Sequence, residues 1–117
     1  MRNSHERTWN EVESEDEKMR VYISGAITGT DDFMERFKEA EDRLAGGGMG
    51  VINPAHANSY MPEDTTYEEY MKLSFFLLDM CDAVYMMDGW EDSKGANREY
   101  GYALAKGKEI MFESAKG

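Results

Sequence analysis

The sequence predicts an α/β protein built as a small three-layer sandwich, with four or five parallel strands between two layers of helices. Short β-rich runs alternate along the chain with segments whose apolar residues recur at helical spacing. Residues 83–87 are continuously apolar, as expected of a central parallel strand that helices cover on both faces. Strands joined through helices in this order form right-handed crossovers, as in flavodoxin-like and Rossmann-like sheets.

The expected strands are short runs rich in β-branched, aromatic or other apolar residues. Gly25 stops the first run and Pro54 stops the second, because neither residue favours continuation of a strand. The four runs are residues 20–24, 50–53, 83–87 and 109–113.

The first helix is predicted from apolar residues at positions i, i+4, i+7 and i+11. These are Phe33, Phe37, Ala40 and Leu44. Thr30 can cap this helix, with Asp31 and Asp32 near its positive end, and the glycines at 46–48 end it. Residues 54–65 are expected to form a loop.

Two further helices follow. Thr66 and Glu69 fit a capping box, in which each side chain bonds the other residue's free amide. The helix that they start is expected to turn Tyr67, Tyr70, Met71, Leu77 and Leu78 inward. After a polar loop at 89–94, residues 95–106 form the last helix, which Gly107 stops. Its expected inner residues are Ala96, Tyr100, Ala103 and Leu104.

Composition limits the classes of function. The 117 residues include 24 Asp or Glu and 13 Lys or Arg, for a formal net charge of −11. An excess of acid this large argues against polymeric nucleic acid and anionic membranes as partners, so any phosphate must be bound locally by amides and hydroxyls. Cys81 is the single cysteine, which excludes an internal disulfide and a cysteine-based zinc site.

Residues 1–18 are expected to form a flexible acidic tail, and residues 19–117 a single domain. No segment has the composition of a secretory signal or a membrane span, so a cytoplasmic location is expected. His5 and His56 have no partners at metal-ligand spacing, and neither a metal site nor a cofactor is predicted.

Two loops follow expected strands at the edge of the sheet where ligands bind in such folds. The first, residues 24–30, contains Ser24, Gly25, Ala26 and Gly29. Its small residues let backbone amides approach an anion, and its hydroxyls add donors. Because the loop lacks the glycine and lysine spacing of known phosphate-binding loops, a plain tight turn is the alternative.

The second loop leads into the last helix and offers more chemistry. Ser93 can cap that helix, and the amides of Gly95 and Ala96 lie in its first turn, where the helix dipole favours an anion. Glu99 shares a face with Ala96 and Ala103, whose small side chains would let its carboxylate face a groove. An exposed helix acid is the alternative.

Two segments, residues 21–29 and 81–103, resemble the nucleoside 2-deoxyribosyltransferase superfamily, in particular a branch of short bacterial and phage domains. The chain is also similar to the 2′-deoxynucleoside 5′-monophosphate N-glycosidases. The similarity covers roughly residues 20–113, and two motifs at matching separation make it more specific than either motif alone. It implies a flavodoxin-like fold and association into homodimers or larger homo-oligomers.

The resemblance also implies roles for individual residues. Glu99, in its Ser-x-Gly-x-x-x-Glu setting, matches the nucleophile that attacks the anomeric carbon of a deoxyribosyl group and expels the base. Tyr22 matches a tyrosine that orients this glutamate. Ser24, Gly25 and Ser93 match positions that hold a 5′-phosphate. The implied ligand is a nucleoside or nucleotide, and the implied reaction is N-glycosyl cleavage or deoxyribosyl transfer.

One position departs from the family pattern. The superfamily usually has an aspartate on the second helix that protonates the base or positions the sugar, and here Ser74 occupies that position. Asp88 and Asp92 are possible substitutes for it, and Trp90 can stack on a base or contact a neighbouring subunit. A non-catalytic nucleotide-binding module is therefore the main alternative to an enzyme, and a structural protein of the same fold is a third.

Overall fold

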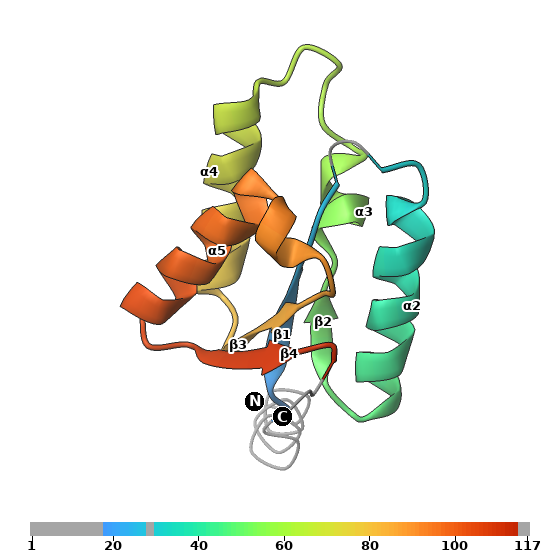
Figure 1. Cartoon of the computed structure of the whole chain (residues 1–117), viewed down its shortest axis with the longest axis vertical. Helices are drawn as coiled ribbons and strands as arrows, with labels where there is room; N and C mark the ends of the chain where they lie inside the picture. The colour runs from blue at the N-terminus through green and yellow to red at the C-terminus, as the bar shows by residue number, and fades with distance from the viewer. Residues whose placement is uncertain (1–17, 28–29, 115–117) are drawn as a thin grey trace, which may run out of the picture.

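The computed structural model describes residues 18–27 and 30–114. It contains a four-stranded, fully parallel sheet in the order β2-β1-β3-β4, which confirms the predicted fold class (Figure 1). The strands are β1 (Arg20–Ser24), β2 (Gly50–Ile52), β3 (Ala83–Met86) and β4 (Glu109–Phe112). The helices are α2 (Phe33–Gly46), α3 (Pro54–Asn58), α4 (Tyr67–Asp79) and α5 (Lys94–Ala105), with a 3-10 turn, η1 (Trp90–Asp92), before α5.

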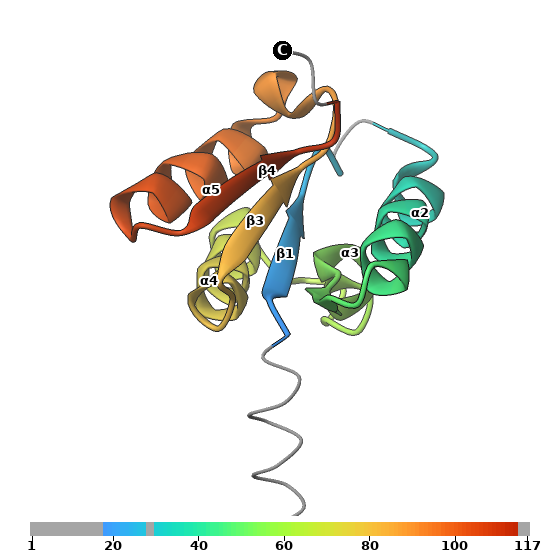
Figure 2. The ribbon, with the colours of Figure 1, turned by 90° about the horizontal axis from the view of Figure 1, so that it is seen from below.

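Helices cover both faces of the sheet (Figure 2). Helices α2 and α3 lie on one face, and α4 and α5 lie on the other. Because side chains alternate along a strand, β1 sends Val21 and Ile23 into the core under α2, and it sends Tyr22 into the core under α5. All four residues of β3 are buried, as the apolar run predicted.

Local signals explain most element boundaries. Thr66 and Glu69 form the predicted capping box at the start of α4. Gly107, with a φ of 74°, follows α5 in the left-handed conformation that glycine adopts at least cost. The N-cap of α2, however, is Asp32, and the Thr30 hydroxyl instead donates to the Ile27 carbonyl, so the predicted Thr30 cap is wrong.

The predicted loop at 54–65 contains the short helix α3, so that prediction is wrong in part. Pro54 does end β2, but it also occupies the first turn of α3, where its missing N–H costs nothing. Asn53 caps this helix by accepting hydrogen bonds from the amides of Ala55 and His56. Together, Asn53 and Pro54 form a helix-start signal.

Two expected core residues lie at the surface. Leu104 is 53% exposed and Tyr67 is 40% exposed. The inner face of α5 carries Ala96, Glu99 and Ala103 instead, and that of α4 carries Met71, Ser74 and Leu78. Among the described residues, no helix is long and apolar enough to cross a membrane.

Candidate functional site

Glu99 is the one buried acidic side chain among the described residues, and two hydroxyl groups hold its carboxylate. The Tyr22 hydroxyl donates to Glu99 Oε2 at 2.7 Å, and the Ser24 hydroxyl donates to Glu99 Oε1 at 2.5 Å. Tyr22 and Ser24 have no exposed surface, and Glu99 is 7% exposed. Each carboxylate oxygen thus has one fixed donor and keeps a lone pair for another group.

The local sequence explains how these side chains meet. Tyr22 and Ser24 are two residues apart on β1, so both point to the face of the sheet that α5 covers. Ala96 and Ala103 lie about one turn on either side of Glu99 and are fully buried. Because their side chains are small, α5 can approach β1 closely enough for the Glu99 carboxylate to reach both hydroxyls.

Burial controls the protonation of this cluster. Loss of water raises the pKa of Glu99 above its ordinary value of 4.5, and the hydrogen bonds from Ser24 and Tyr22, together with the nearby Ser74 hydroxyl, oppose that rise without cancelling it. Burial, followed by the charge of Glu99, also raises the pKa of Tyr22 well above 10.0. Tyr22 therefore remains a neutral donor. Since burial changes the pKa by more than the hydroxyl groups do, the Glu99 carboxylate is more basic than that of an ordinary glutamate.

A pocket of about 330 Å³ opens beside Glu99, within the size range of small-ligand sites. Glu99 is the only Asp or Glu among the described residues that line it. The loop after β1, helices α2 to α5 and the turns next to them all contribute to the wall. These residues are Gly25, Ile27, Phe33, Met34, Ala55, Asn58, Ser59, Tyr67, Tyr70, Met71, Ser74, Ser93, Gly95 and Ala96.

The predicted loop residues fall into four groups. Ser24 is fully buried, donates to Glu99 and does not line the pocket, which corrects its expected role in holding a phosphate. Gly25, Ser93, Gly95 and Ala96 line the pocket. Ala26 is half-buried and does not line it. Gly29 lies outside the described residues.

The start of α5 is capped as predicted, and this changes which amides are free. Ser93 Oγ accepts a hydrogen bond from the Ala96 amide at 3.1 Å. The Ala96 amide is therefore already paired, which corrects its expected role as a phosphate donor. Gly95, also in the first turn, has no carbonyl four residues earlier within the helix, so its amide is the better candidate to meet an anion.

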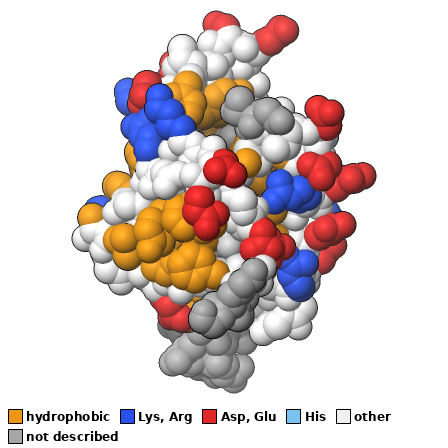
Figure 3. Space-filling view, in the orientation of Figure 1, with side chains coloured by type: hydrophobic (Ala, Val, Ile, Leu, Met, Phe, Trp, Pro, Cys, Tyr) orange, Lys and Arg blue, Asp and Glu red, His pale blue; other side chains and the backbone are white. Residues whose placement is uncertain are grey.

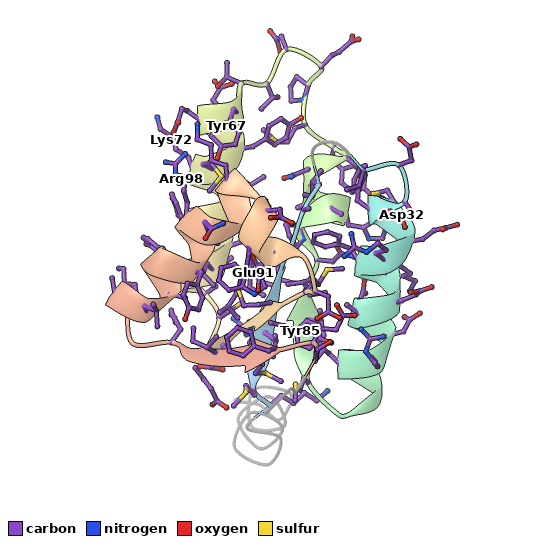
Figure 4. All side chains as sticks on the ribbon, in the orientation of Figure 1. Asp32, Tyr67, Lys72, Tyr85, Glu91 and Arg98 are labelled. Carbon is purple, nitrogen blue, oxygen red and sulfur yellow. The ribbon has the colours of Figure 1, made fainter. Side chains whose placement is uncertain are left out.

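Positive charge gathers where α4 and α5 begin, although the chain is strongly acidic (Figure 3). Figure 4 shows Tyr67, Lys72 and Arg98 close together there. The Lys94 ammonium lies 5.2 Å from the centre of the Tyr67 ring, and Tyr67 lines the pocket. Arg98 is paired with Glu68 through hydrogen bonds of 3.1 and 3.3 Å. Lys94 is thus an exposed cation beside a pocket-lining residue.

Three predicted residues lie apart from this pocket. Asp88 and Trp90 line a separate hollow, where the Ser114 hydroxyl donates to Asp88 Oδ2 at 2.6 Å. The Trp90 ring packs on Tyr100, with ring centres 4.7 Å apart. Asp92 ends η1 and does not line the pocket either. These positions correct the expectation that Asp88 or Asp92 assists Glu99, or that Trp90 stacks on a base bound next to it.

Sequence reasoning did not identify Asn58, Tyr67 and Tyr70 as pocket residues. Asn58 lies in the unexpected helix α3, and the capping signal at Asn53 and Pro54 would have located that helix. Both tyrosines are expected in the core, but Tyr67 is exposed and Tyr70 is half-buried, in the first turns of α4. Among the described residues, no three His, Cys, Asp or Glu side chains gather as a metal site.

Comparison with known proteins gives one match. The model of a family described as a domain of unknown function, DUF4406, matches residues 19–112. No curated protein and no solved structure matches the chain. The matched range includes every described residue of the Glu99 cluster and of its pocket.

Proposed function

The chain belongs to the DUF4406 family, and from its pocket we propose that it cleaves or transfers the N-glycosyl bond of deoxyribonucleosides or their 5′-monophosphates. The observation that carries this proposal is the buried Glu99 carboxylate, held by Tyr22 and Ser24 at the wall of a pocket of about 330 Å³. The resemblance to nucleoside 2-deoxyribosyltransferases supports the choice of substrate class.

The first chemical step is attack by a Glu99 carboxylate oxygen on C1′ of the sugar. The C1′–N bond breaks, its electron pair leaves with the base, and a glycosyl ester forms on Glu99. Water, or a second base, then attacks C1′ and releases the carboxylate. Water gives hydrolysis, and a base gives transfer.

The surroundings of Glu99 suit this step electrostatically. A buried carboxylate has lost its hydration, so the positive charge that develops on the sugar in an oxocarbenium-like transition state is strongly favoured beside it. The hydroxyls of Tyr22 and Ser24 fix the two carboxylate oxygens, and this limits the reorganisation needed for attack. Because burial raises the pKa of Glu99, activity should increase as pH rises through that pKa.

A 5′-phosphate would be bound at the start of α5. The Gly95 amide and the helix dipole attract an anion there, and Lys94 adds a nearby positive charge. Since the whole chain carries a net charge of −11, these local groups must offset a repulsive long-range field.

One observation favours a second candidate, a non-catalytic nucleotide-binding module. Glu99 is the only carboxylate among the described residues of the pocket, and Ser74 lines the pocket where the resemblance predicts an aspartate. A leaving base must then take its proton from solvent or from a hydroxyl such as that of Tyr70. A module of this kind would bind a nucleotide and leave it intact.

The experiment is to incubate the full chain with the four common deoxynucleoside 5′-monophosphates and measure free base by chromatography. The proposal expects base release that Glu99→Gln abolishes and that Glu91→Gln, a change at an exposed acid, leaves intact. Release that survives Glu99→Gln contradicts the mechanism. Thermal stabilisation by a nucleotide without any release supports the binding module instead.

A further inference from the structure

Two positive side chains of α5 lie against one aromatic ring at the rim of the pocket. The Lys94 ammonium is 5.2 Å from the centre of the Tyr67 ring, and the Arg98 guanidinium carbon is 5.6 Å from it. Cations one turn apart on a helix repel each other, whereas the face of an aromatic ring attracts each of them. Because Tyr67 lines the pocket, its ring holds both charges beside the pocket opening.

The same tyrosine reaches the start of α5. A Cβ atom added to Gly95 would lie 3.7 Å from the Tyr67 hydroxyl oxygen, so this hydroxyl lies beside the Gly95 backbone. Gly95 carries the amide that is the better candidate to meet an anion. The Gly95 amide, the Tyr67 hydroxyl and the two cations therefore follow one another from the pocket to the surface.

The acidic side chains nearby do not neutralise these cations. Glu68 pairs with Arg98 through bonds of 3.1 and 3.3 Å, and Glu69 is engaged in the capping box of α4. Lys94 forms no salt bridge with the described residues. Lys72, one turn after Glu68, adds a third cation on this side of the molecule (Figure 4). Three positive charges thus face two carboxylates, in a chain whose net charge is −11.

The two α5 cations differ in freedom. The Arg98 guanidinium carbon also lies 5.7 Å from the centre of the Phe75 ring, and only 35% of the side chain is exposed. A guanidinium held by two rings and a carboxylate is positioned before a ligand arrives, so it loses little conformational freedom on binding an anion. Lys94 is exposed and can turn toward that anion.

We propose that Lys94 and Arg98 bind a second phosphate group, so that the pocket takes nucleoside 5′-diphosphates in preference to monophosphates. This inference rests on the proposed function, which puts the first phosphate at the Gly95 amide. The second phosphate is joined to the first and lies against the cations on the Tyr67 ring. Since the acidic chain repels a diphosphate more than a monophosphate, only a local positive site reverses the order of affinity.

The test measures binding, so that it does not depend on turnover. The full chain carrying Glu99→Gln is titrated with the common deoxynucleoside 5′-monophosphates and with the matching 5′-diphosphates, in the presence of a metal chelator. We expect the diphosphate to bind about tenfold more tightly than the monophosphate of the same base. Adding Lys94→Gln should reduce this ratio to about one or below, and adding Lys94→Arg, which keeps the charge, should preserve the preference.

Lys106→Gln is the matched control. Lys106 directly follows α5, and its ammonium lies 5.4 Å from the centre of the Tyr102 ring, so the change removes the same charge and the same kind of ring contact at the other end of the helix. The diphosphate preference should survive it. Equal or weaker binding of the diphosphate, a preference that survives Lys94→Gln, or an equal loss after Lys106→Gln overturns the proposal.

The outcome separates the two proposals. If the diphosphate preference depends on Lys94 and the unsubstituted chain releases no base from either kind of nucleotide, the second phosphate site stands and the glycosidase mechanism fails. If base is released with no diphosphate preference, the mechanism stands and the second phosphate site fails. If no nucleotide binds, both fail.

Discussion

Replacing Glu99 by Gln should change how the stability of the protein depends on pH. Burial raises the pKa of Glu99 above 4.5, so the folded protein holds this proton more tightly than the unfolded chain does. The protonated carboxyl of Glu99 therefore contributes fully to the free energy of unfolding below pH 4.5. This contribution is lost as pH rises through the folded-state pKa. Gln has nearly the same shape and does not titrate, so Glu99→Gln removes this loss.

The size of the effect follows from linkage. Between the unfolded and folded pKa values, the difference in bound protons is close to one, and the free energy of unfolding changes by about 1.4 kcal/mol per pH unit. The stability of Glu99→Gln relative to the unsubstituted chain should therefore rise with pH, at up to about 1.4 kcal/mol per unit, and level off above the folded-state pKa. Near pH 4 the two proteins should differ little.

Urea unfolding followed by circular dichroism at half-unit steps from pH 4 to pH 9 measures this difference directly. Glu91→Gln removes an exposed carboxyl and serves as the matched control, whose stability should run parallel to that of the unsubstituted chain (Figure 4). Parallel curves for Glu99→Gln, or a relative stability that falls as pH rises, would refute the reasoning. Parallel curves would mean that the hydroxyls offset the cost of burying the carboxylate, and a falling relative stability would mean that they exceed it.

Three further changes test the surroundings of the site. Tyr22→Phe removes one of the hydrogen bonds that lower the pKa of Glu99, so the pH profile of base release should move to higher pH and stability should fall by about 1–2 kcal/mol. Gly25→Ala would place a methyl group 3.0 Å from the Met87 sulfur, so urea unfolding should show a loss of about 1–3 kcal/mol. Gly101→Ala, where a methyl group meets nothing within 4 Å and the residue lies within α5, should instead stabilise the protein by about 0.5–1 kcal/mol; a loss there would show that the helix does not tolerate ordinary side chains.

Periodicity was sufficient to predict the sheet and the longer helices. The continuous apolar run at β3 and the capping box at α4 depend only on neighbours in sequence, and both are present. The prediction does not contain the short helix α3, because Pro54 indicates the end of a strand, although a proline in the first turn after an asparagine cap also starts a helix. A proline after a strand can end that strand or start a helix, and the residue before it decides between the two.

The cluster of Glu99, Tyr22 and Ser24 was predictable in part, because residue spacing along a single strand or helix determines which face each side chain occupies. Alternation along β1 puts Tyr22 and Ser24 on one face, and the small residues around Glu99 put it on the inner face of α5. The remainder depends on how elements distant in sequence pack together. The separation of Asp88 from Glu99, and the position of Asn58 in the same pocket, follow from the relative placement of η1, α3 and α5. Local patterns do not encode that placement.

The central claim is that Glu99 forms a covalent bond with the sugar. A deoxyribonucleotide analogue whose sugar carries fluorine at C2′ slows the release of such an intermediate, because fluorine disfavours positive charge at C1′. Mass spectrometry of the treated and digested protein should find one glycosyl group, on the peptide that contains Glu99, and none after Glu99→Gln. Base release with no modified peptide, or with the sugar on another residue, would contradict the account.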